Sequence, residues 1–436
     1  MLTISGNRDQ RCDGVSRRNF LQIGAMGIGG LTLADLFALE ARAGVHNSNK
    51  AIINIFLGGG PSHTDLFDLK PNAPKEYRGE FSPIRTNVVG MHICEHMPML
   101  ATVADKFAVI RSIVGTYNDH SSFHTQTGWH KNDLRAVGGH PSLGSVVTKL
   151  QGSPNDPAPP FVSFMGNVSA GYLGPTYQPY RPDGAARSNL SLNVSSSDRL
   201  RDRSKLLKSV DKMRRDIDSS GEMDAMDQFT QRAVGVVTSG KLGEALDYNR
   251  EKPDVLKRYL GDDRYRSSQT RNFLVARRLI EVGVRCVSLN WGGWDTHGKN
   301  FVTLARQLPL LDRGLSALIQ DLQDRRMLDD VMIVMWGEFG RTPKVNKNAG
   351  RDHWSRVMQA FIAGGGMEMG QVIGETDRFG GEAAERPVHL REVFATLYHH
   401  MGIDVSNVKI LDTAGRPQYL VDDRKPIAEL TGSTVA

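Results

Sequence analysis

The chain has 436 residues, of which 39% are hydrophobic and 23% charged, and this composition excludes an intrinsically disordered protein. The formal net charge is +6, but basic and acidic residues are interleaved along the chain, so we expect no nucleic-acid partner. Beyond the N-terminal segment no run of 18 or more apolar residues occurs, and the mature chain is therefore expected to lack a membrane span.

The first 43 residues are typical of an export signal. SRRNFL (16–21) is a twin-arginine signature, a glycine-rich apolar stretch follows it, and ARA (41–43) is a small-x-small cleavage site. A transmembrane anchor is the alternative, but Asp35 and the glycines make the stretch too polar to span a bilayer comfortably. We expect recognition by the twin-arginine export machinery and a periplasmic or exported protein.

From residue 44 onward, apolar runs alternate with amphipathic helical patterns. Strands are expected at 51–57, 106–114, 160–166, 284–290, 331–337 and 358–366, and helices at 272–283 and 303–326. This alternation predicts one α/β domain over 44–436, a three-layer α/β/α sandwich with a mostly parallel central sheet. The polar, charge-dense residues 190–265 interrupt the alternation and predict a helical insertion.

The chain has three cysteines, and Cys12 is expected to leave with the signal. Cys94 and Cys286 could form a disulfide in an oxidising compartment. Cys286 lies inside an apolar run, however, where a free buried thiol is more common. No CxxC motif occurs, which excludes a cysteine-based zinc site.

Acids and histidines follow two of the predicted strands. Asp295 and His297 come after 284–290, and Glu338 follows 331–337 directly. Ligands of open α/β sheets gather at the carboxyl ends of strands, and mixed oxygen and nitrogen donors there suit a divalent metal ion. Asp295 could instead cap the next helix. Asp352 and His353 stand in a glycine-bearing loop, from which adjacent residues can converge on one ion.

Further candidates lie elsewhere in the chain. Arg341 is expected to steady an anionic group beside Glu338, although a simple salt bridge between the two is the alternative. If a helix begins at Asp119, His120 and His124 share one face, and Ser121 offers a hydroxyl at the helix N-terminus. A structural role is the alternative for both histidines.

The first predicted strand ends in a glycine cluster. Gly58-Gly59-Gly60 lacks the GK[ST] ending of a phosphate-binding loop and does not match GxGxxG, so a strand-end turn is expected. Asp65 follows this turn. It is interpreted either as a metal ligand or as a turn or helix N-terminal carboxylate.

Several motifs together resemble a bacterial exported family of unknown function that is classed with sulfatases in the alkaline-phosphatase-like superfamily. They are GGGPSHTDLFDLKP, GGWDTHG, GEFGRTP, GRDHW, GETD and RPVHLREVFATLYHHMGID, and the similarity covers roughly residues 50–425. The resemblance implies an α/β/α fold with a divalent-metal site at the strand ends. In the wider superfamily, a Ser, Thr or modified Cys at a helix start attacks phosphorus or sulfur.

The resemblance also suggests roles for individual residues. Asp295 and His297 correspond to the strand-end acid and histidine, and Glu338 takes the place of a common Asp. Thr127-Gly128 matches the end of the nucleophile helix, which puts the nucleophile near 118–121. Two features depart from the superfamily pattern. Gly58–Gly60 stand where a metal-binding Asp is usual, and the sulfatase signature CxPSR is absent.

We therefore expect an exported, sulfatase-like, metal-dependent hydrolase of phosphate or sulfate esters, acting on a small anionic ester or a sulfated or phosphorylated glycan. The ion is Zn, Mn, Ca or Mg, and the catalytic groups are Ser121, His120 and Arg341. The expected metal ligands are Asp295, His297, Glu338, Asp352, His353 and His124. The alternative is a non-catalytic binding or assembly protein on a degenerate hydrolase scaffold, which the missing first-strand Asp would favour.

Overall fold

The computed structural model describes residues 50–153, 156–182, 240–261, 268–422 and 425–432. The predicted export signal lies outside these residues, and so does most of the predicted insertion at 190–265, so both stay predictions. The described part of the insertion contains helices α11 (Lys241–Leu246) and α12 (Pro253–Leu260).

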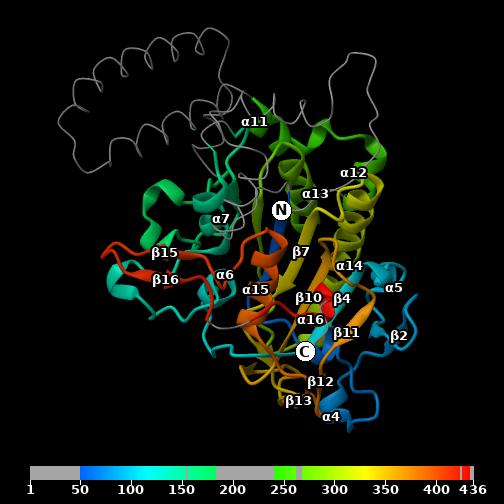
Figure 1. Cartoon of the computed structure of the whole chain (residues 1–436). Coiled ribbons are helices and arrows are strands. Elements are labelled where there is room, and N and C mark those ends of the chain that lie inside the picture. Colours follow the sequence, from blue (N-terminus) through cyan, green and yellow to red (C-terminus); the bar gives the residue numbers. More distant parts are fainter. Residues whose placement is uncertain (1–49, 154–155, 183–239, 262–267, 423–424, 433–436) are drawn as a thin grey trace, which may run out of the picture.

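An eight-stranded sheet forms the centre of the molecule (Figure 1). The strands run in the order β11-β4-β10-β7-β1-β6-β5, and β14 also pairs with β4. Their bounds are β1 Ala51–Leu57, β4 Phe107–Val114, β5 Phe161–Ser163, β6 Cys286–Trp291, β7 Val331–Trp336, β10 Met358–Gly364, β11 Gln371–Ile373 and β14 Val388–His389. All pairings are parallel except those of β10, which is antiparallel to both β4 and β7.

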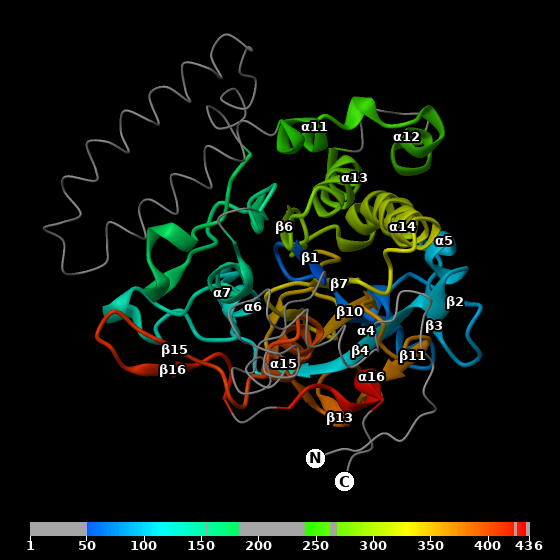
Figure 2. The same ribbon diagram turned by 45° about the horizontal axis from the view of Figure 1, so that its top comes forward.

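Helices cover both faces of this sheet (Figure 2). The long α13 (Ser268–Glu281) and α14 (Asn300–Asp324) pack on one face, while α7 (Leu143–Gln151) and α15 (Leu390–His400) lie on the other. Alternate residues of β1 belong to the two cores. Ile53 and Ile55 pack with the α13 and α14 side, and Ile52 packs with the α15 side. A strand buried on both faces requires a nearly continuous apolar run, which AIINIFL provides except at Asn54, whose side chain pairs with Gln126 and Trp336.

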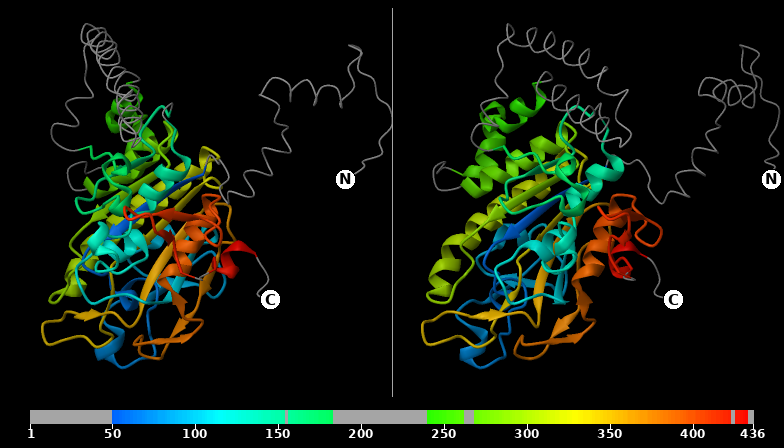
Figure 3. Two further views of the ribbon diagram at one scale, coloured as in Figure 1. Left: turned by 60° about the vertical axis from the view of Figure 1, so that its left-hand side comes forward. Right: turned by 90° about the vertical axis from the view of Figure 1, so that its left-hand side faces the viewer.

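Short elements surround this framework. The other α-helices of the described residues are α3 His63–Leu66, α4 Lys75–Arg78, α5 Pro98–Ala101, α6 Phe123–Thr127 and α16 Ala428–Thr431. Two-stranded sheets pair β2 Pro83–Arg85 with β3 His92–Cys94, β8 Gly340–Arg341 with β9 His353–Trp354, β12 Glu375–Thr376 with β13 Ala383–Glu385, and β15 Lys409–Leu411 with β16 Pro417–Tyr419. The gold β8–β9, blue α4 and orange β12–β13 segments gather at one end of the molecule (Figure 3).

The predicted fold class is confirmed. Each of the six predicted strands forms a strand of the central sheet, and both predicted helices form, as α13 and α14. The strand predicted at 160–166 is shorter than expected, since β5 stops at Ser163 on the edge of the sheet. The direction of β10 is not evident from its sequence, because strand polarity depends on connections that are not local.

Cys94 and Cys286 are both free and buried. Cys94 lies in β3 and Cys286 in β6, and burial raises the pKa of each thiol to about 12. The predicted alternative of a disulfide between them is therefore not found. Within the described residues, none of the helices is long and apolar enough to traverse a bilayer.

We expect the stability of the folded protein to fall in acid because of His140. This residue is 4% exposed and stacks on Trp129 with a ring-centroid distance of 4.2 Å. Burial lowers the pKa of His140 from 6.5 to about 4. Below pH 6.5 the unfolded chain therefore takes up a proton that the folded chain excludes, and stability falls as the pH drops towards 4. The loss is about 3 kcal/mol in the free energy of unfolding.

His140→Phe keeps the aromatic stack and removes this titration. Denaturant unfolding between pH 7 and pH 4 should therefore show a shallower loss of stability in the variant than in the wild-type protein. Equal slopes for the two proteins would contradict the assignment.

Candidate metal centre

Segments from five strands meet at the edge of the sheet where β1, β4, β6 and β7 end. Asp295 and His297 follow β6, Glu338 follows β7, and His120 lies between β4 and α6. Because β10 runs in the opposite direction, its first residue lies at the same edge, and His353 in the preceding β9 is brought there as well. The antiparallel strand thus adds a fifth sequence-predicted residue to the group.

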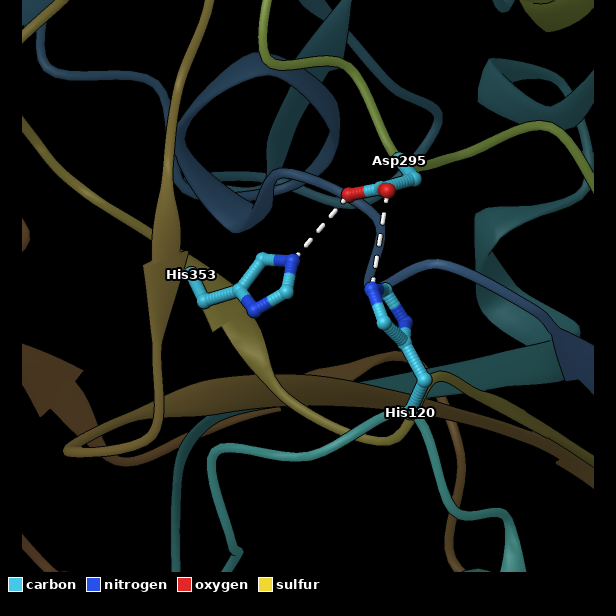
Figure 4. Close-up of side chains that lie close together, drawn as sticks. All are labelled: His120, Asp295 and His353. Atoms are coloured by element: carbon cyan, nitrogen blue, oxygen red, sulfur yellow. Dashed lines mark hydrogen bonds and ion pairs between the residues drawn. The ribbon is translucent and has the colours of Figure 1, made fainter.

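Three of these side chains form a compact group (Figure 4). One ligand atom from each of His120, Asp295 and His353 lies within 4.8 Å of the others. His353 Nε2 is 3.1 Å from Asp295 Oδ1, and His120 Nε2 is 3.5 Å from Asp295 Oδ2. A fourth side chain adjoins them, since His297 Nε2 is 3.0 Å from Asp295 Oδ1 and 3.1 Å from His353 Nε2. Asp295 is therefore the common neighbour of three imidazoles.

The carboxylates of Asp352 and Glu338 accept hydrogen bonds from the Nδ1 atoms of His297 and His120. His297 Nδ1 donates to Asp352 Oδ1 at 2.6 Å, and the same oxygen accepts from Asn346 Nδ2 at 3.2 Å. His120 Nδ1 donates to Glu338 Oε1 at 3.1 Å. The predicted role of Asp352 and Glu338 as direct metal ligands stays a prediction. The structure places each on the Nδ1 side of a histidine whose Nε2 faces Asp295.

The glycine turn after β1 binds the carboxylate of Glu338. Gly59 N donates to Glu338 Oε1 at 2.9 Å, and Gly60 N donates to Oε2 at 3.1 Å. Glu338 is 1% exposed. Burial raises its pKa, while hydrogen bonds from His120 and the Gly59 amide act in the opposite direction. The end of β1, which lacks an acid of its own, thus receives a carboxylate from β7.

Arg341, which is predicted to steady an anionic group, is buried and bonded to the protein itself. Its Nε donates to Gly60 O at 2.9 Å, Nη1 to Arg351 O at 2.9 Å, and Nη2 to Gly59 O and to Asp295 Oδ1, the latter at 2.5 Å. The side chain is fully buried. Its donors are therefore committed to the protein, where they fix the glycine turn against Asp295.

Asp65 forms a buried ion pair, which answers the question left open by the sequence. Arg351 Nε and Nη2 donate to its two oxygens at 2.8 and 2.9 Å, and Asn300 Nδ2 donates at 2.8 Å. All three residues are fully buried. Sequence reasoning missed Arg351. The one signal for it was an arginine inside GRDHW, directly before the two residues that were singled out.

His124 and Ser121 are near His120 in the sequence, but their hydrogen bonds are to groups outside the His120, Asp295 and His353 cluster. His124 Nε2 donates to the backbone oxygen of Glu338 at 2.6 Å, and burial lowers the pKa of this histidine. The imidazole thus holds the chain at Glu338, and its ligand role stays a prediction. Ser121 N donates to Asp119 Oδ1, and Ser121 Oγ accepts from Phe123 N at 3.3 Å.

The protonation states of the group suit cation binding. Burial acts to raise the pKa of Asp295, but hydrogen bonds from Arg341 and His353 outweigh it, and the pKa is lowered. The hydrogen bond from His297 lowers the pKa of Asp352. Burial lowers the pKa of His353 and favours its neutral form. An ionised carboxylate and a neutral imidazole are the forms that bind metal ions.

The close contact at Gly59 gives a test of this arrangement. The residue has a φ of +113°, and a Cβ placed on it would lie 2.3 Å from Asp295 N. Gly90 also has a positive φ, of +84°, but a Cβ there meets no atom within 4 Å. We expect Gly59→Ala to lower the free energy of unfolding by about 3 kcal/mol or more, and Gly90→Ala by about 1 kcal/mol. Urea unfolding measures both, and equal losses would contradict the close approach.

Comparisons with known proteins identify a family but no function. None of the curated proteins matches the chain. Among solved structures, the lipoteichoic acid synthase LtaP from Listeria monocytogenes is similar at 11% identity, over 84% of this chain and 78% of that one, with a TM-score of 0.38. The sulfatase PsFucS1 from Pseudoalteromonas sp. is similar at 11% identity, over 86% and 71%, with a TM-score of 0.36.

The phosphonate monoester hydrolase SpPMH from Silicibacter pomeroyi is similar at 11% identity, over 89% of this chain and 78% of that one, with a TM-score of 0.34. These scores are low, and the fold described above rests on the strands and helices themselves. A family model matches residues 49–431, which is nearly the whole chain beyond the predicted signal. The chain therefore belongs to the family described as protein of unknown function (DUF1501).

Proposed function

We propose that this protein is an exported, metal-dependent hydrolase of phosphate or sulfate esters. The observation that carries the proposal is the convergence of three imidazole Nε2 atoms on the carboxylate of Asp295. His120, Asp295 and His297 have side-chain exposures between 42% and 49%, so a substrate in solution can reach the group. Ion and substrate would meet at the carboxyl edge of the sheet.

The residues present fit a divalent ion. Donor atoms that share one ion at bond lengths of about 2.1 Å lie roughly 3.0 to 3.4 Å apart. The separations around Asp295 are 3.0, 3.1 and 3.5 Å. In addition, His297 donates from Nδ1 to Asp352, and its Nε2 faces both Asp295 Oδ1 and His353 Nε2. A cation bound between these atoms would be shared by all three.

His120, Asp295 and His353 would hold the ion, with His297 beside them. Bound there, a divalent ion would polarise an ester oxygen and make a nearby water or hydroxyl a better nucleophile. The chain itself supplies the negative charge of Asp295 and keeps that carboxylate in place through Arg341. The nucleophile is either Ser121 or a water molecule. The hydroxyl of Ser121 accepts a hydrogen bond from the backbone amide of Phe123.

The substrate class and the destination of the protein complete the proposal. A small anionic ester or a sulfated or phosphorylated glycan fits the motif resemblance, and the absence of CxPSR argues against a formylglycine nucleophile. Export to the periplasm rests on the twin-arginine signature at 16–21. The alternative is a non-catalytic binding or assembly protein on a degenerate hydrolase scaffold. It rests on the missing metal-binding acid after β1, where the carboxylate of Glu338 instead accepts from Gly59 N and from His120.

Replacing the shared carboxylate tests the proposal directly. Asp295→Asn removes the negative charge next to the three imidazole Nε2 atoms. We therefore expect metal binding and the hydrolysis of aryl phosphates or aryl sulfates each to fall by at least about 100-fold. The matched control is Asp324→Asn, because Asp324 is an exposed carboxylate, paired with Arg258 at the end of α14. Hydrolysis by the wild-type protein that Asp295→Asn leaves unchanged would refute the proposed active site.

A further inference from the structure

The candidate metal centre is rich in nitrogen donors and poor in free carboxylate oxygens. We infer that it selects a first-row transition ion such as Zn²⁺ or Co²⁺ over Ca²⁺ and Mg²⁺, with His297 as a fourth donor and with Asp352 and Glu338 as orienting residues. This inference deepens the proposed function and rests on it. The sequence left Zn, Mn, Ca and Mg open, and the inference excludes Ca and Mg from this choice.

Asp352 commits its near oxygen to an imidazole. The 2.6 Å bond from His297 Nδ1 places a proton on Nδ1, and Nε2, at the other side of the ring, lies 3.0 Å from Asp295 Oδ1. Asn346 fixes this arrangement, because its Nδ2 lies 3.2 Å from Asp352 Oδ1 and 3.0 Å from the backbone oxygen of His297. A carboxylate behind a histidine in this way sets its tautomer and makes the outer nitrogen a stronger ligand.

Glu338 also accepts from an imidazole, and both of its carboxylate oxygens are hydrogen-bonded. Both of its oxygens accept from the amides of the glycine turn, and Oε1 also accepts from His120 Nδ1. The side chain is 2% exposed, so it is enclosed by these donors. His120 is therefore held with its Nε2 towards Asp295, and Glu338 has little capacity left for an ion.

Asp295 is the carboxylate that faces the imidazole Nε2 atoms, and Arg341 already bonds to its Oδ1. The centre thus offers a single carboxylate and three imidazole nitrogens. Ca²⁺ takes six to eight oxygen ligands, and Mg²⁺ requires near-octahedral oxygen coordination. Imidazole nitrogen suits Zn²⁺, Co²⁺ and related ions, which accept four or five mixed donors. The donor count decides the ion class.

The test uses the full chain, freed of metal with a chelator and titrated with Co²⁺ while its visible absorption and binding heat are recorded. We expect one Co²⁺ site with the strong absorption of low-coordinate cobalt, which millimolar Ca²⁺ or Mg²⁺ does not displace. Asp352→Ala should weaken Co²⁺ binding by roughly 10- to 100-fold. Asp324→Ala, the matched change at an exposed carboxylate, should leave binding unchanged. Circular dichroism of each variant establishes that it is folded.

The outcomes separate the two claims. Displacement of Co²⁺ by equimolar Ca²⁺ or Mg²⁺, or unchanged binding in folded Asp352→Ala, overturns the inference and leaves the proposed hydrolase intact. Selective Co²⁺ or Zn²⁺ binding without hydrolysis of any aryl phosphate or sulfate supports the inference and overturns the proposed function. If Co²⁺, Zn²⁺, Ca²⁺ and Mg²⁺ all fail to bind to the wild-type chain, both claims fail.

Discussion

The glycine turn after β1 is the constraint on which the candidate site depends. Its two amides bind Glu338, and its two carbonyls bind Arg341, which in turn holds Asp295. A buried carboxylate and a buried guanidinium are tolerated only when their polar atoms are paired, and here the backbone of two residues pairs with both. A side chain at Gly59 would collide with the backbone of Asp295. The amides of the turn thus hold the carboxylate of Glu338 at the end of β1.

Much of the fold could be predicted from local pattern. The runs at 51–57 and 331–337 are almost entirely apolar because both strands are buried on both faces, and each forms the strand that its pattern indicated. What local pattern could not show was how the strands pair. β10 reverses direction between two parallel neighbours, and this reversal brings His353 to the edge where β1, β4, β6 and β7 end. A short strand such as β14 carries too few residues for a period to be visible.

The residues of the site could be found from sequence, but their roles could not. Asp295 and His353 lie together as expected of candidate ligands. The carboxylate of Asp352 and the imidazole of His124 have the right chemistry for ligands, yet one accepts from His297 and the other donates to a backbone oxygen. Motif spacing and strand ends indicate which residues come near one another. Which atom of a side chain faces the site depends on the packing around that side chain. Arg341 shows the same limit, since an arginine near an acid suggests a substrate contact until its burial is known.

The central claim is that Asp295 and the imidazoles around it bind one divalent ion. Crystals of the protein grown with Zn²⁺, with diffraction recorded above and below the zinc absorption edge, test it most directly. The account predicts a single anomalous peak at about 2.0 to 2.2 Å from Asp295 and from Nε2 of His120 and His353. A map without that peak, in which His297 Nε2 donates directly to Asp295, would contradict it and would show a network of ion pairs in place of a metal centre.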